Sequence, residues 1–231
     1  MNKLTIIVTY YNAEEYITGC LESIKQQRTQ DFNLIIVNDG STDQSKKLMD
    51  EAIKDYDKNI RFIDLDENSG HAHARNIALE EVETPYFMFL DADDELASYA
   101  ITFYLEKFNN TDGLIAPIHS FTTQRPQFVD LDRVRVEFFN AKVNINSFLR
   151  KQSACNIIFR TAIVRAHHIR FNENLNTYVD WSFVLEYMKY VNKFVRIFNF
   201  PFYFRGEVYD PFETLTLSEQ NFDILFKDYV N

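Results

Sequence analysis

The sequence predicts an α/β fold of the Rossmann-like kind, with a mostly parallel central sheet flanked by helices. Apolar runs of strand length alternate with helix-length amphipathic segments through the first half of the chain. The runs at 34–37 and 86–90 are apolar without interruption, which is typical of strands buried on both faces. Polar turns follow several of them directly. A β-α-β-α order of this kind places the carboxyl ends of the strands at one edge of the sheet, where ligands bind.

The elements of the first half follow from this alternation. Four strands are expected, at 4–8, 34–37, 61–65 and 86–90. The first helix carries apolar residues from 16 to 24, the second ends near 53 and the third spans 73–82. Capping boxes are expected to begin the first two helices, one formed by Asn12 with Glu15 and the other by Ser41 with Gln44.

The second half has a less regular pattern. Strands are expected at 113–119, 154–160 and 194–205, and helices at 144–150 and 180–191. The segment 122–139 has no clear period. We predict a single domain over 1–231, with a nucleotide-binding half over 1–110 and an acceptor-side half over 111–231. Helical spacing at 222–230 runs to the end of the sequence, so we expect either a fragment of a longer protein or a short docked helix.

Composition and charge disfavour several classes of protein. The chain has 231 residues, 46% of them hydrophobic, which is a globular composition. Its formal net charge of -10 disfavours nucleic acid and anionic lipid as general partners. No apolar stretch approaches the roughly 20 residues of a membrane span, and no signal peptide is evident. Cys20 and Cys155 are the only cysteines, which suits simple burial and a cytoplasmic protein.

Three acidic residues follow the apolar run at 86–90. Asp91, Asp93 and Asp94 crowd negative charge at the expected carboxyl end of a strand. Carboxylates this close repel one another unless a cation or a donor group is present. Their oxygens are the ligands that Mg²⁺ and Mn²⁺ prefer, and Mg²⁺ is commonly shared with substrate phosphates. The turn therefore predicts a metal–diphosphate site, with a solvated loop as the alternative.

Polar side chains also stand in two glycine-containing turns. Gly40 follows Asp39, and Gly70 precedes the helix that carries Arg75. Glycine permits a positive φ and a close approach of the backbone to a ligand. Asp39 could accept the imide N–H of a uracil ring, Tyr11 could stack on the base, and Arg75 could place positive charge beside a diphosphate. The alternatives are an ordinary turn at Asp39 and an ordinary surface charge at Arg75.

Two histidines lie near the start of the third expected helix. His71 and His73 are two residues apart, so they do not share a helical face and suit metal chelation poorly. We expect them in a loop or lining a ligand site.

Four segments together resemble the family 2 glycosyltransferases with the GT-A fold. They are VTYYN at 8–12, VNDGSTD at 37–43, NSGHAHARN at 68–76 and FLDADD at 89–94. They occur in the order and spacing of that family across about the first hundred residues. The resemblance implies an inverting transferase that uses a nucleotide-diphosphate sugar donor, usually UDP-linked, together with Mn²⁺ or Mg²⁺.

The resemblance also implies roles for residues of the nucleotide-binding half. Tyr11 would line the base pocket, and Asp39 would contact uracil. Arg75 would lie near the base or the phosphates, and Asp91 would hold the ribose. Thr9 stands at a nucleotide-binding position where the family often has proline.

Three further roles follow from the same resemblance. Asp93 would bind the metal. Asp180 would act as general base, removing the proton from the acceptor hydroxyl as that hydroxyl attacks the anomeric carbon. Arg205 would reach a phosphate. The alternative for Asp180 is a helix N-cap, and the alternative for Trp181 as an acceptor platform is a core position.

Two departures from the family pattern bear on activity. Asn38 replaces an aspartate that commonly precedes Asp39, and Val179 replaces a glutamate that usually precedes the base. Two hypotheses therefore stand: an active, metal-dependent glycosyltransferase, and a catalytically impaired GT-A-like module that binds nucleotide or polymer. The retained acidic residues favour the first. A nucleotidyltransferase is a third alternative, but the expected phosphate loop rich in glycine and lysine is missing.

The chain as a whole also resembles the N-terminal region of teichoic acid glycerophosphate polymerases. This resemblance implies an attached C-terminal domain in the full protein that carries the polymerase chemistry. It also implies a wall-polymer acceptor such as teichoic acid, and a location in the cytoplasm or at the inner face of the cell membrane. No residue of this chain is assigned to glycerophosphate transfer.

Overall fold

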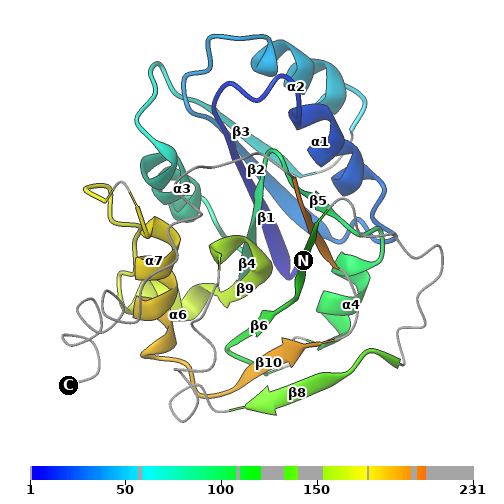
Figure 1. The fold of residues 1–231 in the computed structure, drawn as a ribbon, viewed down its shortest axis with the longest axis vertical. Coiled ribbons are helices and arrows are strands. Elements are labelled where there is room, and N and C mark those ends of the chain that lie inside the picture. The colour runs from blue at the N-terminus through cyan, green and yellow to red at the C-terminus, as the bar shows by residue number, and fades with distance from the viewer. Residues whose placement is uncertain are drawn as a thin grey trace.

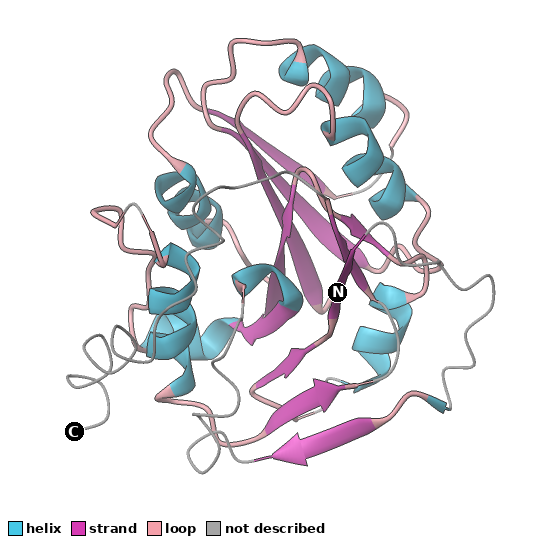
Figure 2. Cartoon of the chain, in the orientation of Figure 1, coloured by secondary structure: helices cyan, strands magenta, loops and turns pink. Residues whose placement is uncertain are grey.

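The computed structural model describes residues 2–56, 59–107, 110–120, 133–139, 153–175, 177–198 and 202–206. Its strands are β1 (Leu4–Tyr10), β2 (Phe32–Asn38), β3 (Ile60–Asp64), β4 (Tyr86–Asp91), β5 (Glu95–Leu96), β6 (Gly113–Ile115), β7 (Ile118–Ser120), β8 (Val136–Phe139), β9 (Ile157–Arg160), β10 (Phe194–Ile197) and β11 (Tyr203–Arg205). Its helices are α1 (Ile17–Lys25), α2 (Ser45–Ile53), α3 (His71–Glu80), α4 (Ala100–Lys107), α6 (Thr161–Ala166) and α7 (Val179–Met188), with the 3₁₀ turn η2 (Ala154–Asn156). Helices lie on both sides of the strands (Figure 1; Figure 2).

Eight of the described strands form one mixed sheet, in the order β3-β2-β1-β4-β9-β6-β10-β8. β3, β2, β1 and β4 run parallel to one another, and β9 runs antiparallel to both β4 and β6. β10 is parallel to β6 and antiparallel to β8. A smaller sheet has the order β5-β11-β7. Because β4 pairs with β9, the large sheet combines strands from early and late parts of the chain.

The order of the first four strands creates a switch point between β1 and β4. The chain moves outward from β1 to β2 and β3, and then returns to add β4 on the other side of β1. Because parallel crossovers are right-handed, α1 and α2 lie on one face of the sheet and α3 on the other (Figure 1). The switch point therefore lies between the carboxyl ends of β1 and β4, where Thr9 is the register partner of Asp91.

An aromatic cluster packs β4, β9 and α7 together. Phe87 of β4 stacks on Phe159 of β9 with ring centroids 5.3 Å apart, and Phe183 of α7 meets Phe159 edge to face at 5.2 Å. Phe171 stacks on Phe183 at 4.1 Å. All of these rings are buried, and a ring of this size removes about 150–250 Å² of surface from water. The cluster thus holds α7 against the strand that leads into the acidic turn.

Neither expected capping box forms. α1 begins at Ile17 and α2 at Ser45, and neither N-cap residue makes a side-chain cap. Instead, the loops before these helices form hydrogen bonds with each other. The Ser41 hydroxyl accepts from the Asn12 N–H at 3.0 Å, and Asn12 Oδ1 accepts from the Thr42 N–H at 2.9 Å. The capping prediction was wrong because these side chains find partners 29 and 30 residues away rather than within their own turn.

The strands of the second half are shorter than predicted. The run at 113–119 divides into β6 and β7, which belong to different sheets, and the run at 194–205 divides into β10 and β11 in the same way. The run at 154–160 begins as η2 before it becomes β9. The expected helices at 144–150 and 222–230 lie outside the described residues.

Candidate active site

A hollow of about 290 Å³ lies at the switch point between β1 and β4. Its lining comes from the end of β1 and the loop after it, the first half of α3, and the end of β4 with the turn after it, and consists of Thr9, Tyr10, Tyr11, Asn12, Ala13, Tyr16, His71, Arg75, Asp91, Ala92 and Asp93. The structure therefore brings together five residues that the sequence marked for nucleotide or metal binding: Thr9, Tyr11, Arg75, Asp91 and Asp93.

Arg75 is buried beside this hollow and pairs with two carboxylates. Its Nη2 donates to Asp91 Oδ1 at 2.7 Å, and its Nη1 donates to Asp180 Oδ1. Burial would lower the pKa of Arg75, but the charges of Asp180 and Asp91 outweigh it and hold that pKa well above its ordinary value. Phe89 and Phe171 lie at cation–π distance, with ring centroids 5.4 and 5.3 Å from Cζ. Because Arg75 is only 5% exposed, the surface-charge alternative is wrong.

Asp180 lies in the first turn of α7, where the positive end of the helix dipole favours a carboxylate. Its Oδ2 accepts from the Ser153 hydroxyl at 2.9 Å and from the Ala154 N–H at 3.0 Å. Burial would raise the pKa of Asp180, but Arg75 and these hydrogen bonds outweigh it and lower that pKa. Asp180 is therefore ionised at neutral pH. The N-cap of α7 is Tyr178, with a φ of 60°, so the N-cap alternative for Asp180 is wrong.

Asp39 ties the loop after β2 to the loop before α3. Its Oδ1 accepts from the Ser69 N–H at 2.8 Å, and its Oδ2 accepts from the Gly70 N–H at 2.9 Å. Gly40 has a φ of 67°, and a Cβ there would lie 2.4 Å from the carbonyl carbon of Glu67. This glycine therefore permits a close approach to a neighbouring loop. Asp39 is buried and does not line the hollow, so its contact with a base stays a prediction.

The turn after β4 brings three carboxylates together. Oxygens of Asp91, Asp93 and Asp94 lie within 4.8 Å of one another. Asp94 accepts hydrogen bonds from the Tyr203 hydroxyl and from the Gly206 N–H. Burial, together with the charges of Asp91 and Asp93, raises the pKa of Asp94 to about 7. A cluster of oxygen donors that is partly buried fits Mg²⁺ or Mn²⁺, and it is not the solvated loop of the alternative.

Arg205 lies on β11, outside the hollow. The next residue, Gly206, packs against the acidic turn, because a Cβ there would lie 2.4 Å from the Asp93 carbonyl oxygen. The strand therefore ends beside the carboxylate cluster, and the phosphate contact of Arg205 stays a prediction. Trp181 is partly buried against the hydrophobic core.

Asn38 and Val179, which differ from the family pattern, both suit their surroundings. Asn38 is buried, donates to Asp64 Oδ1 at 2.6 Å and accepts from the Ser41 N–H at 3.0 Å. An aspartate at this position would face the Asp64 carboxylate. Val179 is 4% exposed, so a glutamate there would bring a charge into the core.

Sequence reasoning missed Ser153 and Cys155 as residues of the site. The Cys155 thiol donates to Asp91 Oδ2 at 3.0 Å and accepts from Arg75 Nη2 at 3.5 Å. The sequence predicted only that this cysteine is buried, which is confirmed. No local pattern marks its polar contacts, because the partners lie 64 and 80 residues away. Of the two histidines expected near a ligand, His71 lines the hollow.

Comparison with known proteins identifies the family. The family model described as glycosyl transferase family 2 matches residues 5–169. The chain belongs to glycosyltransferase family 2. A teichoic acid poly(glycerol phosphate) polymerase of Staphylococcus epidermidis is 99% identical over 231 residues, which are 100% of this chain and 32% of that relative. TarS of Staphylococcus aureus, a poly(ribitol-phosphate) beta-N-acetylglucosaminyltransferase, is 28% identical over 80% of this chain and 32% of its own length.

A solved structure confirms the predicted GT-A fold of this family 2 chain. The crystal structure of S. aureus TarS 1-349 in complex with UDP-GlcNAc matches it with a TM-score of 0.77 and 23% identity, covering 98% of this chain and 65% of that one. The chain thus spans about a third of the length of the two curated relatives. Among the helices of the described residues, none combines the length and the apolar character that crossing a membrane requires.

Proposed function

We propose that this family 2 domain transfers a sugar from a UDP-linked donor to a hydroxyl group of a teichoic acid polymer, with inversion at the anomeric carbon. The observation that carries the proposal is the network of Arg75 with Asp91 and Asp180, which holds an ionised carboxylate next to residues that line the switch-point hollow. The names of the two relatives support a glycerol phosphate or ribitol phosphate polymer as acceptor. The complex of TarS with UDP-GlcNAc supports a UDP-linked donor.

The donor is proposed to lie in the hollow with its base towards β1 and its diphosphate towards the acidic turn. Thr9 and Tyr11 line the base side, and the exposed ring of Tyr11 offers a face for stacking. Asp91 holds the ribose, and Asp39 contacts the base from the neighbouring loop. Arg205 contacts a phosphate from β11, next to the acidic turn.

Asp180 is proposed as the general base. The oxygen of the acceptor hydroxyl attacks the anomeric carbon, the bond from that carbon to the diphosphate breaks, and the hydroxyl proton passes to Asp180. Because the pKa of Asp180 is lowered, the carboxylate is ionised but weakly basic, so the proton moves as the new bond forms. Arg75 keeps Asp180 ionised and adds positive charge near the departing diphosphate. The products are the glycosylated polymer and UDP.

A divalent cation, Mn²⁺ or Mg²⁺, is the proposed cofactor. Asp93 would hold it, because this residue belongs to the carboxylate cluster and lines the hollow. When bound, the cation supplies positive charge to the diphosphate. Since the cluster concentrates negative charge where the diphosphate would lie, we expect nucleotide binding to depend on the metal.

The wider setting of the chain is part of the same proposal. Residues 1–231 form one domain, with the nucleotide site in 1–110 and the acceptor side in 111–231. Because the chain covers 32% of its near-identical relative, we propose an attached C-terminal domain in the full protein. The domain works in the cytoplasm or at the inner face of the membrane, and nucleic acid is not a partner given the net charge of -10.

Calorimetric titration of UDP tests the donor site. We expect the wild-type chain to bind UDP when Mn²⁺ is present, to bind CDP more weakly, and to lose the metal-dependent binding in Asp93→Ala. Asp66→Ala is the matched control, since Asp66 is an exposed aspartate that does not line the hollow. No binding of UDP by folded wild-type protein would contradict the proposal.

Turnover tests the base. With UDP-GlcNAc as the first donor of a UDP-sugar screen and poly(glycerol phosphate) as acceptor, Asp180→Asn should lower UDP release by about 10²–10⁴-fold while UDP affinity is retained. Binding of UDP without turnover of any UDP-sugar would instead favour the impaired binding module.

A further inference from the structure

Asp91 and Asp180 are held on two sides. Arg75 donates to Oδ1 of each carboxylate. Cys155 of η2 contacts Oδ2 of Asp91, and Ser153, the residue that precedes η2, contacts Oδ2 of Asp180. Both acidic side chains therefore lie between a buried cation and one short turn.

Ser153 provides the contact to Asp180. Its hydroxyl lies 2.9 Å from Asp180 Oδ2 and also accepts from the Cys155 N–H at 3.2 Å, which caps η2. Since a hydroxyl has one proton, accepting from the backbone leaves that proton directed at the carboxylate. The Ala154 N–H adds a second bond to the same oxygen at 3.0 Å. The turn thus orients the Asp180 carboxylate.

Cys155 provides the contact to Asp91. Its side chain is fully buried, and its Sγ lies 3.0 Å from Asp91 Oδ2 and 3.5 Å from Arg75 Nη2. Burial raises the pKa of the thiol well above its ordinary value, so at neutral pH the thiol retains the proton that it donates. Both of these polar contacts join Cys155 to the network of Arg75 with Asp91 and Asp180.

We propose that Ser153 and Cys155 are positioning residues of the transfer reaction, Ser153 for the base Asp180 and Cys155 for the ribose-binding Asp91. This inference rests on the function proposed above. It predicts separable effects, because one contact serves proton transfer and the other serves nucleotide binding. Loss of one hydrogen bond to a carboxylate corresponds to a change of roughly 10-fold in the affected step.

The serine is tested by Ser153→Ala. We expect kcat to fall roughly 10-fold while the Kd for UDP is unchanged, and Ser153→Thr to restore kcat because it keeps the hydroxyl. The matched control is Ser182→Ala. Ser182 also lies in the first turn of α7, but its hydroxyl donates to the Val179 carbonyl oxygen at 2.8 Å and not to Asp180.

The cysteine is tested by Cys155→Ala. We expect the Kd for UDP to rise roughly 10-fold while kcat at saturating donor is retained, and Cys155→Ser to bind UDP as the wild type does because it keeps a donor. Cys20→Ala is the matched control. Cys20 is also a buried thiol, but it lies 3.5 Å from the backbone oxygen of Asp91 rather than its carboxylate.

Parallel losses of kcat and UDP affinity in both variants, or equal losses in the controls, would overturn the inference. Crystal structures of the variants add a readout that needs no turnover. We expect the Asp180 carboxylate to rotate in Ser153→Ala and the Asp91 carboxylate to rotate in Cys155→Ala. Unmoved carboxylates would overturn the positioning roles even if sugar transfer is observed. Rotated carboxylates in a chain that does not bind UDP would support positioning and contradict only the proposed function.

Discussion

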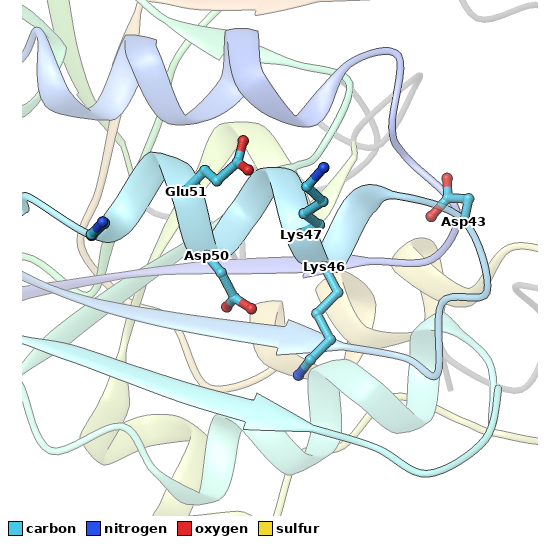
Figure 3. A pocket seen from close by; sticks show the side chains of 6 residues that line it. Asp43, Lys46, Lys47, Asp50 and Glu51 are labelled. Carbon is cyan, nitrogen blue, oxygen red and sulfur yellow. The ribbon is translucent and has the colours of Figure 1, made fainter.

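Two hollows of this molecule are lined by charged side chains of both signs, and they differ in what those charges touch. The larger, of about 510 Å³, lies along α2 and is lined by Asp43, Lys46, Lys47, Asp50, Glu51 and Lys54. Lys46 and Asp50 project to one side of α2, and Lys47 and Glu51 to the other (Figure 3). The smaller, of about 290 Å³, lies at the switch point and includes the buried Arg75.

The ion pairs of the two regions differ in burial and therefore in the stabilisation that they contribute. The side chains of Lys46 and its partner Asp64 are 45% and 42% exposed, whereas that of Arg75 is 6% exposed. Exposed ion pairs stabilise a protein by about 0–1 kcal/mol, while removing one partner of a buried pair costs about 3–5 kcal/mol. The larger hollow is therefore not the one proposed as the donor site, and the proposed site is the smaller hollow beside the buried charge network.

The largest expected effect is on the buried network. Arg75→Met should lower the free energy of unfolding by about 3–5 kcal/mol, because two carboxylates lose their shared cation. Urea denaturation measures this change. Arg61→Met is the control: Arg61 pairs with Glu81 at an exposed position, so its loss should cost about 1 kcal/mol or less. Equal losses in the two variants would contradict the expected difference between buried and exposed ion pairs.

The second effect is a pH dependence of the same network. Because the folded-state pKa of Asp180 is lowered, its stabilising contribution is complete above the unfolded-state value of about 3.9 and is lost as the pH falls through the folded-state value. Asp180→Asn should therefore be less stable than the wild type at pH 7, by about 1–3 kcal/mol. The difference should shrink on acidification. Urea denaturation across this range measures it, and a difference that grows towards low pH would contradict the assignment.

A third effect, of similar size, is expected at the contact between Asn38 and Asp64. Asn38→Asp should destabilise the protein by about 1–3 kcal/mol, because it places a buried carboxylate against Asp64, the partner of Lys46. Asp64→Asn in the same chain should recover most of this loss. A double-mutant cycle measures the coupling between positions 38 and 64. Additive effects would show that the Asn38–Asp64 contact does not determine this residue choice.

The smallest effect is expected on α2. Lys47→Ala, in the exposed charged face of that helix, should change the free energy of unfolding by no more than about 0.5 kcal/mol. Thermal denaturation and UDP titration measure stability and binding together. A clear loss of UDP affinity would show that the larger hollow contributes to the site, and it would contradict the different roles assigned to the two hollows.

The fold could be predicted well where strands are buried on both faces. The run expected at 86–90 became β4, Tyr86–Asp91, because a strand that is buried on both faces is apolar at nearly every position. The three-residue strands β6 and β7 are too short to show a period of their own. Whether they form one strand or two depends on pairing with β10 and β11 far along the chain.

The candidate site, like the fold, has one part that the sequence predicts and another part that depends on contacts between distant residues. The local sequence alone shows which polar residues stand at the ends of strands, among them Asp39 and Asp91, since the change from apolar to polar is a local property. The partners of these residues depend on tertiary contacts. Arg75 meets Asp180 across 105 residues, because the packing of aromatic side chains brings α7 against β4 and removes water from the pair. Burial and distance give such a pair its energy, and neither exists before the chain has folded.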